Sequence, residues 1–370
     1  MKQLRKITVL PGDGIGPEVI AQAIKILDSI KNKYGHKWIY FYADIGSIAI
    51  DNHGDPYPEE TEESCINSDA ILLGAIGDPK YDNDPSAKVR PEQGLLKMRK
   101  TLGLYSNIRP VRVHPSVAHL SPVKEERLKG VDFVIFRELT GGLYFGKKER
   151  QKDFASDLCN YTRKEIKRVA KLAFEMAQRR KKKLTLVDKA NVLETSRLWR
   201  EVVSKMSVKY PDVETNYLFV DNAAMQLIIN PAQFDVVLCS NLFGDIISDE
   251  ASVLVGSLGL LPSASRGKTH SLYEPVHGSY PQAAGKDIAN PFATILSVEM
   301  MLRDFGLTDE ADDILKAFDF CIQHEIGTVD LGGNFNLSCN LVGDAMSILI
   351  DEGINKIRSD KFIQSFSTII

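Results

Sequence analysis

The sequence predicts an α/β fold organised in two domains. Short apolar runs of strand length alternate with amphipathic helical runs, which is the pattern of βα units. Polar and charged residues follow directly after these runs, as in residues 235–250, where α/β proteins place their working side chains. The 370 residues also exceed what one core usually holds, so two domains or one large α/β unit is expected.

Composition restricts the classes of partner. The 46 basic and 49 acidic residues balance to a net charge of −3, so we expect no nucleic-acid partner. No apolar run approaches the roughly 20 residues needed to span a bilayer, so we expect no membrane segment. Five scattered cysteines, and a first strand at residues 7–10 that leaves no room for a signal peptide, predict a cytoplasmic protein with reduced thiols.

The first predicted strand leads into the glycine-rich segment GDGIGPE at residues 12–18. Its glycine spacing does not match the dinucleotide fingerprint, and a proline stands at the helix start. Backbone amides in such a loop could still meet an anion. We interpret the segment as a tight active-site turn. Further strands of the N-terminal third are predicted at residues 38–43 and 70–73.

A helix is predicted at residues 92–100, after a long polar loop at residues 74–91. Glu92, Leu95, Leu96 and Arg99 fall at positions i, i+3, i+4 and i+7, so they share one helix face. A plain core face would not carry charge at both ends. The stripe therefore predicts the wall of a site that combines an apolar pocket with a carboxylate clamp.

The middle of the chain repeats the strand-then-charge pattern. Strands are predicted at residues 133–136, 184–187, 217–220 and 235–240. Asp221 and Asn222 are predicted to cap a helix at residues 223–229. A glycine-flanked excursion that starts at residues 141–146 could reach a partner subunit.

The segment NLFGDIISDE at residues 241–250 opens a helix predicted to reach Leu258. Asp245 and Asp249 are four residues apart, so their carboxylates lie one turn apart on one face. Two such carboxylates need a cation, and oxygen ligands suit Mg²⁺ or Mn²⁺. A solvated acidic helix start is the alternative.

The C-terminal third contains a segment that imitates a phosphate-binding P-loop, RGKT at residues 266–269. Pro262 stands where that motif needs its first glycine, so we reject a P-loop hydrolase. Residues 273–291 are predicted to form a long ordered loop. Helices are predicted at residues 292–302, 309–326 and 340–350.

Residues at or near the ends of the predicted strands form one chemical set. Arginines suit a substrate with more than one carboxylate, aspartates suit a divalent metal, and a lysine and a tyrosine can move protons. Singly, each has an ordinary explanation as a surface ion pair, a helix cap or a core residue. The set is Arg99, Arg109, Arg137, Tyr144, Lys189, Asp221, Asp245 and Asp249.

Long motifs in the chain resemble those of the β-decarboxylating dehydrogenases, the family of the isopropylmalate, isocitrate, homoisocitrate and tartrate dehydrogenases. The motifs are GDGIGPE (12–18), Arg99 with NIRP (107–110), VDKANV (187–192), NLFGDIISD (241–249) and EPVHGS (274–279). The resemblance implies a fold that is not Rossmann, with two domains that share a mixed sheet and a cleft between them. Residues 1–104 and 256–370 would form the nucleotide-side domain, and residues 105–255 the domain for substrate, metal and dimerisation.

Within the family, Leu95 and Leu96 resemble the leucine pair of the isopropylmalate enzymes, which receives the isopropyl group of the substrate. By the same resemblance, Val192 of the other subunit completes this apolar pocket. The resemblance therefore implies oxidative decarboxylation of (2R,3S)-3-isopropylmalate to 4-methyl-2-oxopentanoate and CO₂, with reduction of NAD, in leucine biosynthesis. Two alternatives stay open. One is a related enzyme acting on tartrate, D-malate or homoisocitrate, and the other is a non-catalytic regulatory subunit.

The resemblance also implies a role for each residue of the set in a homodimer with shared active sites. Mg²⁺ or Mn²⁺ would be bound by Asp221 of one subunit and by Asp245 and Asp249 of the other. Lys189, beside Asp221, would act in removing the hydroxyl proton, and Tyr144 would protonate the enol. The residues expected to orient the substrate carboxylates are Arg99, Arg109 and Arg137.

For the cofactor, the resemblance implies NAD. Many NAD-using relatives have an aspartate where this chain has Gln282, whereas NADP-using relatives have a lysine there. This chain has no Lys or Arg at that position or at residues 328–333, so a 2′-phosphate would lack a counter-charge. The implied cofactor-binding residues are Gly77, Glu92, Glu274, His277, Gly278, Ser279, Gln282 and Asn290.

Overall fold

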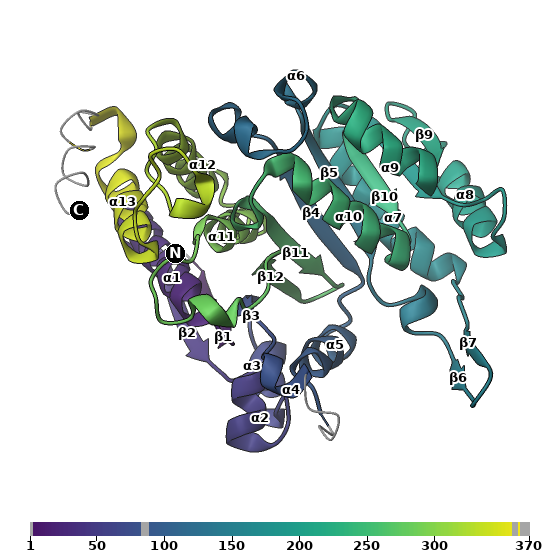
Figure 1. Ribbon diagram of the computed structural model, residues 1–370, viewed down its shortest axis with the longest axis horizontal. Helices are drawn as coiled ribbons and strands as arrows, with labels where there is room; N and C mark the ends of the chain where they lie inside the picture. Colours follow the sequence, from purple (N-terminus) through teal and green to yellow (C-terminus); the bar gives the residue numbers. More distant parts are fainter. Residues whose placement is uncertain (1–2, 83–88, 357–361, 363–370) are drawn as a thin grey trace. The chain divides into compact units, whose positions relative to one another are not determined.

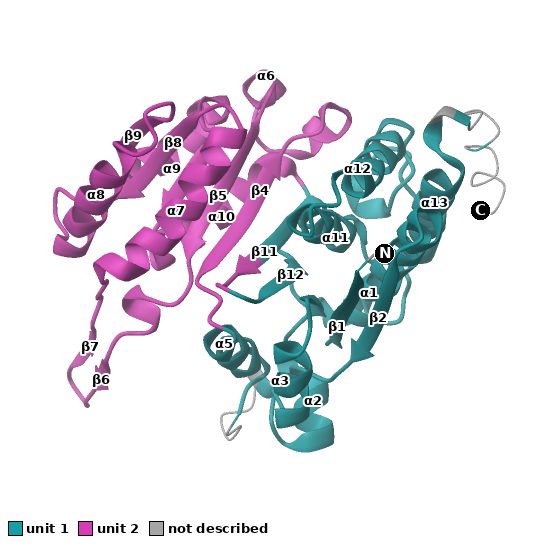
Figure 2. Cartoon of the chain, turned by 180° about the vertical axis from the view of Figure 1, so that it is seen from behind, with its two compact units in different colours: residues 1–102, 257–264, 269–370 teal, residues 103–256, 265–268 magenta. Residues whose placement is uncertain are grey.

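A computed structural model describes residues 3–82, 89–356 and 362 of the chain (Figure 1). The chain forms two compact units (Figure 2). Unit 1 comprises residues 1–102, 257–264 and 269–370, and unit 2 comprises residues 103–256 and 265–268. The part of the predicted loop 74–91 at residues 83–88 lies outside the described residues.

Unit 1 contains a parallel sheet with the strand order β2-β1-β3-β12. Strand β1 pairs in parallel with both β2 and β3, and β3 pairs in parallel with β12. Every residue of β3 is buried, as expected for a strand covered on both faces. The strands are β1 (Leu4–Gly12), β2 (Lys37–Tyr42), β3 (Ala70–Ala75) and β12 (Ser271–Pro275).

The helices of unit 1 bury apolar stripes, as α1 illustrates. Pro17 lies in its first turn, where a missing N–H costs nothing, and Gly35 ends it with a left-handed φ of 69°. Its buried face, which includes Val19, Ala23 and Ile30, faces the core. The helices are α1 (Gly16–Tyr34), α2 (Ser47–His53), α3 (Glu59–Ile66), α4 (Pro79–Asp82), α5 (Pro91–Thr101), α11 (Phe292–Asp304), α12 (Thr308–Gln323) and α13 (Cys339–Glu352).

Unit 2 contains strands in the order β4-β5-β10-β8-β9. Strand β4 runs antiparallel to β5, whereas the other neighbours pair in parallel, so the sheet is mixed. The strand β11 (Pro262–Arg266) belongs to both units, because residues 262–264 fall in unit 1 and residues 265–266 in unit 2. The other strands are β4 (Ser106–Arg112), β5 (Asp132–Glu138), β8 (Lys183–Asp188), β9 (Glu214–Phe219) and β10 (Val236–Cys239).

Helices α9 and α10 begin directly after strands β9 and β10, so the carboxyl ends of these two strands lead into helix starts. A two-stranded hairpin, β6 (Lys148–Arg150) with β7 (Ala155–Asp157), projects from unit 2, and all six of its residues are exposed. The helices are α6 (Glu125–Leu128), α7 (Arg163–Arg179), α8 (Glu194–Ser207), α9 (Val220–Ile229) and α10 (Asn241–Val255). Across the described residues, no helix has the length and apolar character that a membrane crossing requires.

Three local predictions are wrong. Asp221 does not cap α9, because β9 ends at Phe219, opposite Asp188 of β8, and the helix begins at the next residue. Helix α10 ends at Val255, because Gly256 takes a left-handed φ of 85°. Residues 273–275 belong to strand β12 and not to a loop, since pairing with β3 extends the sheet there.

Candidate active site

Arg137, near the carboxyl end of β5, is held against the first turns of α10. Its Nε and NH2 both donate to Oδ1 of Asn241, at 3.1 and 2.9 Å, and its NH1 pairs with Oδ1 of Asp245. A Cβ on Gly244 would lie 2.7 Å from Cγ of Arg137, so a glycine at this position leaves room for the arginine. The guanidinium is therefore fixed on one side and presents its other edge to a carboxylate.

Arg109 of β4 makes the corresponding pair one helical turn further along α10. Its NH1 donates to Oδ1 of Asp249 at 2.9 Å and to Oγ of Ser248 at 2.7 Å, while its Nε donates to Oδ1 of Asn107 at 2.9 Å. Unit 2 thus brings together four residues predicted for one site. The two candidate metal ligands are each paired with a candidate substrate arginine.

Tyr144 joins the same cluster from the 3₁₀ helix at Gly142–Tyr144. Its hydroxyl donates to Oδ2 of Asp245 at 2.8 Å, and its ring centroid lies 5.9 Å from Cζ of Arg137. Partial burial, followed by the hydrogen bond to Asp245, raises the pKa of Tyr144 above its ordinary value. The phenol therefore keeps its proton at neutral pH and is available as a proton donor.

Lys189 and Asp221 form a second group in unit 2. Lys189 follows directly after β8, and its Nζ lies 2.7 Å from Oδ1 of Asp221 in the first turn of α9. The hydrogen bond from Lys189 lowers the pKa of the exposed Asp221 carboxyl. The parallel pairing of β8 with β9 produces this neighbourhood, because both strands end at the same edge. Val192, three residues beyond Lys189, is exposed.

The carboxylates suit a hard divalent cation, but the described part of the chain does not by itself assemble a complete set of ligands. Asp245 and Asp249 lie on α10 and Asp221 lies on α9, and all three supply oxygen donors, the type that Mg²⁺ and Mn²⁺ prefer. Among the described residues, no group of three or more His, Cys, Asp or Glu side chains could hold a metal ion. The donor chemistry therefore fits the predicted metal, with two donors offered by α10.

In unit 1, helix α5 carries the predicted site wall. Arg99 donates from NH2 to Oε1 of Glu274 at 3.0 Å, and both side chains are largely buried. Leu95 is half-buried and Leu96 is exposed, so an apolar surface on α5 has no cover within unit 1. The helical spacing predicted for residues 92–99 is confirmed, because all of them lie within α5.

Three of the predicted cofactor residues meet in unit 1. A Cβ on Gly77 would lie 3.2 Å from Oε1 of Glu92 and 3.4 Å from Oγ of Ser279. A Cβ on Gly278 would meet no atom within 4 Å, so the backbone is open there. Burial lowers the pKa of His277, which is therefore neutral at physiological pH.

Asn290 uses both ends of its side-chain amide inside unit 1. Its Oδ1 accepts from N of Phe292 at 3.0 Å, and its Nδ2 donates to Oδ2 of Asp330 at 3.0 Å. Gln282 is exposed in the 3₁₀ helix at Pro281–Ala283.

The family model for isocitrate/isopropylmalate dehydrogenase matches residues 6–346. The chain belongs to this family. The family and the α/β fold class predicted from the motifs are therefore confirmed, and the protein is a β-decarboxylating dehydrogenase.

Several 3-isopropylmalate dehydrogenases share a sequence identity of just over one half with this chain. The 3-isopropylmalate dehydrogenase of Bacteroides fragilis is 53% identical over 326 residues, which cover 88% of this chain and 92% of the relative. That of Aquifex aeolicus is 52% identical over 344 residues, covering 91% and 93%.

Solved structures of the family resemble the chain along nearly its whole length. The isocitrate dehydrogenase of Methylococcus capsulatus aligns with a TM-score of 0.82 and 33% identity, covering 94% of this chain and 99% of that one. A β-decarboxylating dehydrogenase of Thermococcus kodakarensis aligns with a TM-score of 0.80 and 34% identity, covering 95% and 97%.

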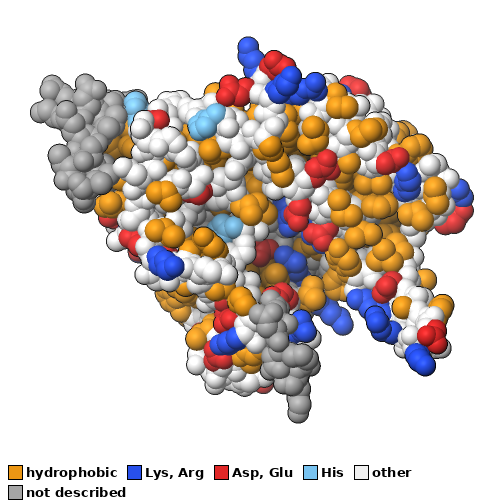
Figure 3. Space-filling model, in the orientation of Figure 1, with side chains coloured by type: hydrophobic (Ala, Val, Ile, Leu, Met, Phe, Trp, Pro, Cys, Tyr) orange, Lys and Arg blue, Asp and Glu red, His pale blue; other side chains and the backbone are white. Residues whose placement is uncertain are grey.

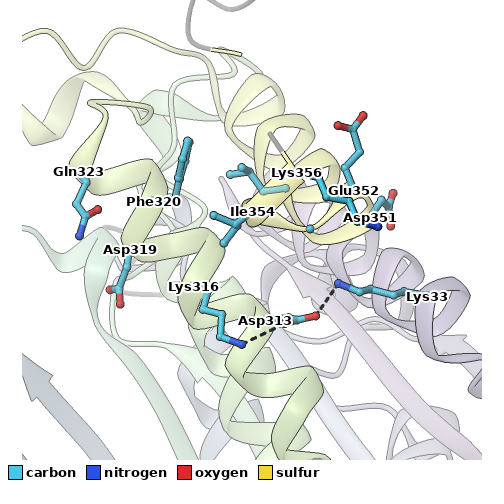
Figure 4. A pocket seen from close by; sticks show the side chains of 12 residues that line it. Lys33, Asp313, Lys316, Asp319, Phe320, Gln323, Asp351, Glu352, Ile354 and Lys356 are labelled. Carbon is cyan, nitrogen blue, oxygen red and sulfur yellow. Dashed lines mark hydrogen bonds and ion pairs between the residues drawn. The ribbon is translucent and has the colours of Figure 1, made fainter. Parts of the chain in front are cut away.

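Unit 1 of this dehydrogenase also has a hollow of about 640 Å³ that contains none of the candidate residues. It lies beside α12 and α13, where Asp313 pairs with both Lys33 and Lys316 (Figure 4). Phe320 and Ile354 also line it. Its lining differs chemically from the arginine–aspartate clusters, so we place no catalytic role there.

Three residues that position candidate site residues within their own units were not singled out from the sequence. Asn241 clamps Arg137, Asp330 holds Asn290, and Asp13 binds several backbone amides. For Asn241 a signal existed, because it opens the motif that carries Asp245 and Asp249. Asp330 lies in residues 328–333, for which the sequence-based prediction concerned only basic residues.

Proposed function

We propose that this enzyme oxidises and decarboxylates 3-isopropylmalate to 4-methyl-2-oxopentanoate and CO₂, with reduction of NAD, as a step of leucine biosynthesis. The observation that carries the proposal is the face of α5, where the leucines Leu95 and Leu96 stand between Glu92 and Arg99. The names of the relatives that are 52–53% identical support the same substrate. An alkyl branch is the substituent that such a leucine pair would bind.

The three arginines would orient the substrate carboxylates. Each already holds a carboxylate of the protein: Arg109 holds that of Asp249, Arg137 that of Asp245 and Arg99 that of Glu274. These pairs act as internal stand-ins for a dicarboxylic acid, which would replace them on binding. Charge neutralisation and orientation then come from the same groups.

Leu95, Leu96 and Val192 of a second subunit would receive the isopropyl group. Leu96 and Val192 are exposed in the protomer, at 48% and 62%, so they have apolar area to bury against a ligand. Burying the branch would stabilise the complex by roughly 0.8 kcal/mol per CH₂ group. A carboxylate in the same place would lose its hydration without gaining a partner.

Asp245 and Asp249, with Asp221 of a second subunit, would hold Mg²⁺ or Mn²⁺. When bound, the cation would act as a Lewis acid on the C2 oxygen of the substrate. Lys189, whose Nζ donates to Oδ1 of Asp221 at 2.7 Å, would act in removing the C2 hydroxyl proton. Tyr144, whose raised pKa keeps it protonated, would return a proton to the carbon that loses CO₂.

NAD would bind to unit 1, along residues 77–92 and 274–290. The open backbone at Gly278 leaves space for a ligand, and Gly77, Glu92 and Ser279 lie together. Residues 328–333 contribute the carboxylate of Asp330 and no base, which disfavours a 2′-phosphate. Under this proposal unit 1 is the nucleotide-side domain, and unit 2 carries substrate, metal and the subunit contact.

A homodimer would complete the site. Apolar side chains remain exposed on the adjacent helices α9 and α10, at Met225, Ile229, Ile246 and Val253. Figure 3 shows hydrophobic side chains gathered over these helices. An exposed apolar patch of this kind is typical of a subunit interface.

The five free cysteines agree with a reducing compartment, so we place the enzyme in the cytoplasm.

The decisive experiment measures NADH production from 3-isopropylmalate with Mg²⁺ and after removal of the metal by a chelator. Activity should depend on the metal and should be lost in Lys189→Ala. The control Lys205→Ala, which removes an exposed lysine paired with Glu201 on α8, should remain active. A preference for tartrate, D-malate or homoisocitrate would refute the substrate assignment, and absence of any turnover would indicate a regulatory subunit.

The shared site is tested by mixing two inactive variants. In a hybrid of Lys189→Ala and Asp245→Asn subunits, one of the two sites would combine an intact Lys189 with an intact Asp245. Refolding the two variants together should therefore restore part of the activity that neither has alone. No recovery in proven hybrids would contradict active sites built from two subunits.

A further inference from the structure

The glycine-rich turn at residues 12–16 uses its amides within unit 1. N of Asp13 donates to O of Ala75 at 2.8 Å, N of Ile15 donates to O of Ser279 at 2.8 Å, and N of Gly16 donates to O of Asp13 at 2.9 Å. Three amides that could have met an anion are therefore occupied. The turn instead connects two segments that are far apart in sequence.

Glycine is required at two positions of this turn because the backbone of the two connected segments lies very close to it. Gly12 has a φ of 69°, and a Cβ there would lie 2.0 Å from O of Ala75. Gly14 has a φ of 58°, and a Cβ there would lie 2.0 Å from O of Ser279. Both positions exclude any other residue on two grounds, steric overlap and backbone conformation.

The side chain of Asp13 adds a third set of contacts. Its Oδ2 accepts from N of Ser47 at 2.8 Å and from N of Gly77 at 2.9 Å, and its Oδ1 accepts from N of Ile48 at 3.0 Å. The residue is 6% exposed, and burial raises the pKa of its carboxyl in opposition to these three amides. One buried carboxylate therefore ties the start of α2 to the segment after β3.

The neighbouring side chain, Ile15, anchors the other segment. Ile15 is buried in an apolar cluster with Val19 of α1, with Cys339 of α13, and with Ala283 and Ala289. Ala283 and Ala289 belong to the stretch between β12 and α11. The turn therefore grips this stretch both through the backbone bond to Ser279 and through packing.

We propose that residues 12–16 form a staple for two cofactor loops, residues 76–78 and residues 276–291, and that Asp13 is the positioning residue for NAD binding. The inference rests on the proposed function, which assigns these loops to NAD. Gly77, Ser279 and Gln282 are in the loops that the staple holds. Asp13 acts through Gly77 and the start of α2, and it does not itself touch the cofactor.

The test measures NADH affinity by fluorescence, together with the separate KM values for NAD and 3-isopropylmalate. Asp13→Ala loses all three amide contacts, and Asp13→Asn keeps the shape of the side chain and can keep the two bonds to Oδ2. We expect Asp13→Ala to raise the Kd for NADH about tenfold, since hydrogen bonds to charged groups are the strong ones. Asp13→Asn should fall between Asp13→Ala and the wild type. The KM for 3-isopropylmalate and the kcat at saturating NAD should stay within about twofold.

Asp69 supplies a matched control in the same unit. It precedes β3, at the opposite end of the strand from Gly77, and its Oδ2 accepts from N of Lys6 at 2.7 Å. Asp69→Ala and Asp69→Asn should lower the thermal midpoint without changing NADH affinity. The proposal is overturned if Asp13→Ala folds and binds NADH with the affinity of the wild type or of the matching Asp69 variant. If Asp13→Ala does not fold, the same comparison is made with Asp13→Asn. The proposal is also overturned if both KM values rise equally. Failure of the wild type to bind NADH would instead count against the proposed function.

Discussion

The NH1 of Arg109 lies 2.9 Å from Oδ1 of Asp249, so a candidate substrate-binding arginine neutralises the carboxylate of a candidate metal ligand. Arg137 and Asp245 repeat the relationship one turn away on α10. Two consequences follow. The arginines reduce the repulsion between the carboxylates of Asp245 and Asp249. A cation that binds these two carboxylates must displace Arg137 and Arg109 from them.

We therefore expect metal and substrate to bind with positive linkage. Arg109→Gln should increase the affinity for Mn²⁺ in the absence of substrate, by at most about fivefold, because Asp249 is exposed and such an ion pair contributes about 1 kcal/mol or less. The same variant should weaken substrate binding. Mn²⁺ titration followed by electron paramagnetic resonance measures the first effect directly. Lower Mn²⁺ affinity in the variant would contradict this exchange of partners.

Tyr144→Phe should slow turnover by roughly 10²–10⁴-fold, because the variant loses a positioned proton donor. The KM values should change little, since the ring remains beside Arg137. Steady-state kinetics measures the effect. Tyr210→Phe is the control for loss of a hydroxyl, because the ring of Tyr210 stacks on Phe174 in unit 2. Full activity of Tyr144→Phe would remove this residue from the mechanism.

Gly244→Ala should raise the KM for the hydroxy-diacid about tenfold or more. The added Cβ would lie 2.7 Å from Cγ of Arg137, so the guanidinium must leave Asn241 and Asp245. Overpacking of this kind typically destabilises by about 1–3 kcal/mol, which a urea melt would detect. Ser252→Ala, at a half-buried position on the same helix, should change neither quantity. An unchanged KM in folded Gly244→Ala would show that Arg137 does not position the substrate.

Gln282→Asp should sharpen the preference for NAD over NADP. A carboxylate at this exposed position would repel a 2′-phosphate and accept hydrogen bonds from ribose hydroxyls. We expect kcat/KM with NADP to fall several-fold while the value with NAD holds or rises. The ratio of the two values, measured with saturating 3-isopropylmalate, provides the check. Equal losses with both cofactors would place Gln282 away from the ribose.

Glu138 should make stability depend on pH. Burial raises the pKa of its carboxyl, although it accepts from Thr140, Gly141 and Arg168. A raised carboxyl pKa favours folding below its ordinary value near 4.5, and this contribution is lost as pH rises through the folded-state pKa.

Glu138→Gln removes that titration. The unfolding free energy of the variant, relative to the wild type, should therefore increase between pH 4.5 and pH 8. Urea denaturation of both proteins at several pH values measures the difference. If the unfolding free energy of Glu138→Gln minus that of the wild type instead fell as pH rises, the assigned direction would be contradicted.

The sequence by itself determined the family, the alternation of strands and helices, and the spacing of residues along single elements. Asp245 and Asp249 share a face of α10 because helical periodicity places i and i+4 together. Arg137 stands at the end of β5 because apolar residues suited to a strand precede it. Such features depend on neighbours in sequence, so a local pattern carries them.

Only the tertiary structure decided which side chains meet. Arg137 finds Asn241 and Asp245 more than 100 residues away because the register of β5 against β10 aligns their carboxyl ends. Asp13 reaches Gly77 because β1 and β3 pair in parallel and end side by side. The start of α9 was missed for the same reason, since pairing with β8 and not local capping preference ends β9 at Phe219. Strand register is a property of the whole sheet, and no short stretch of sequence contains it.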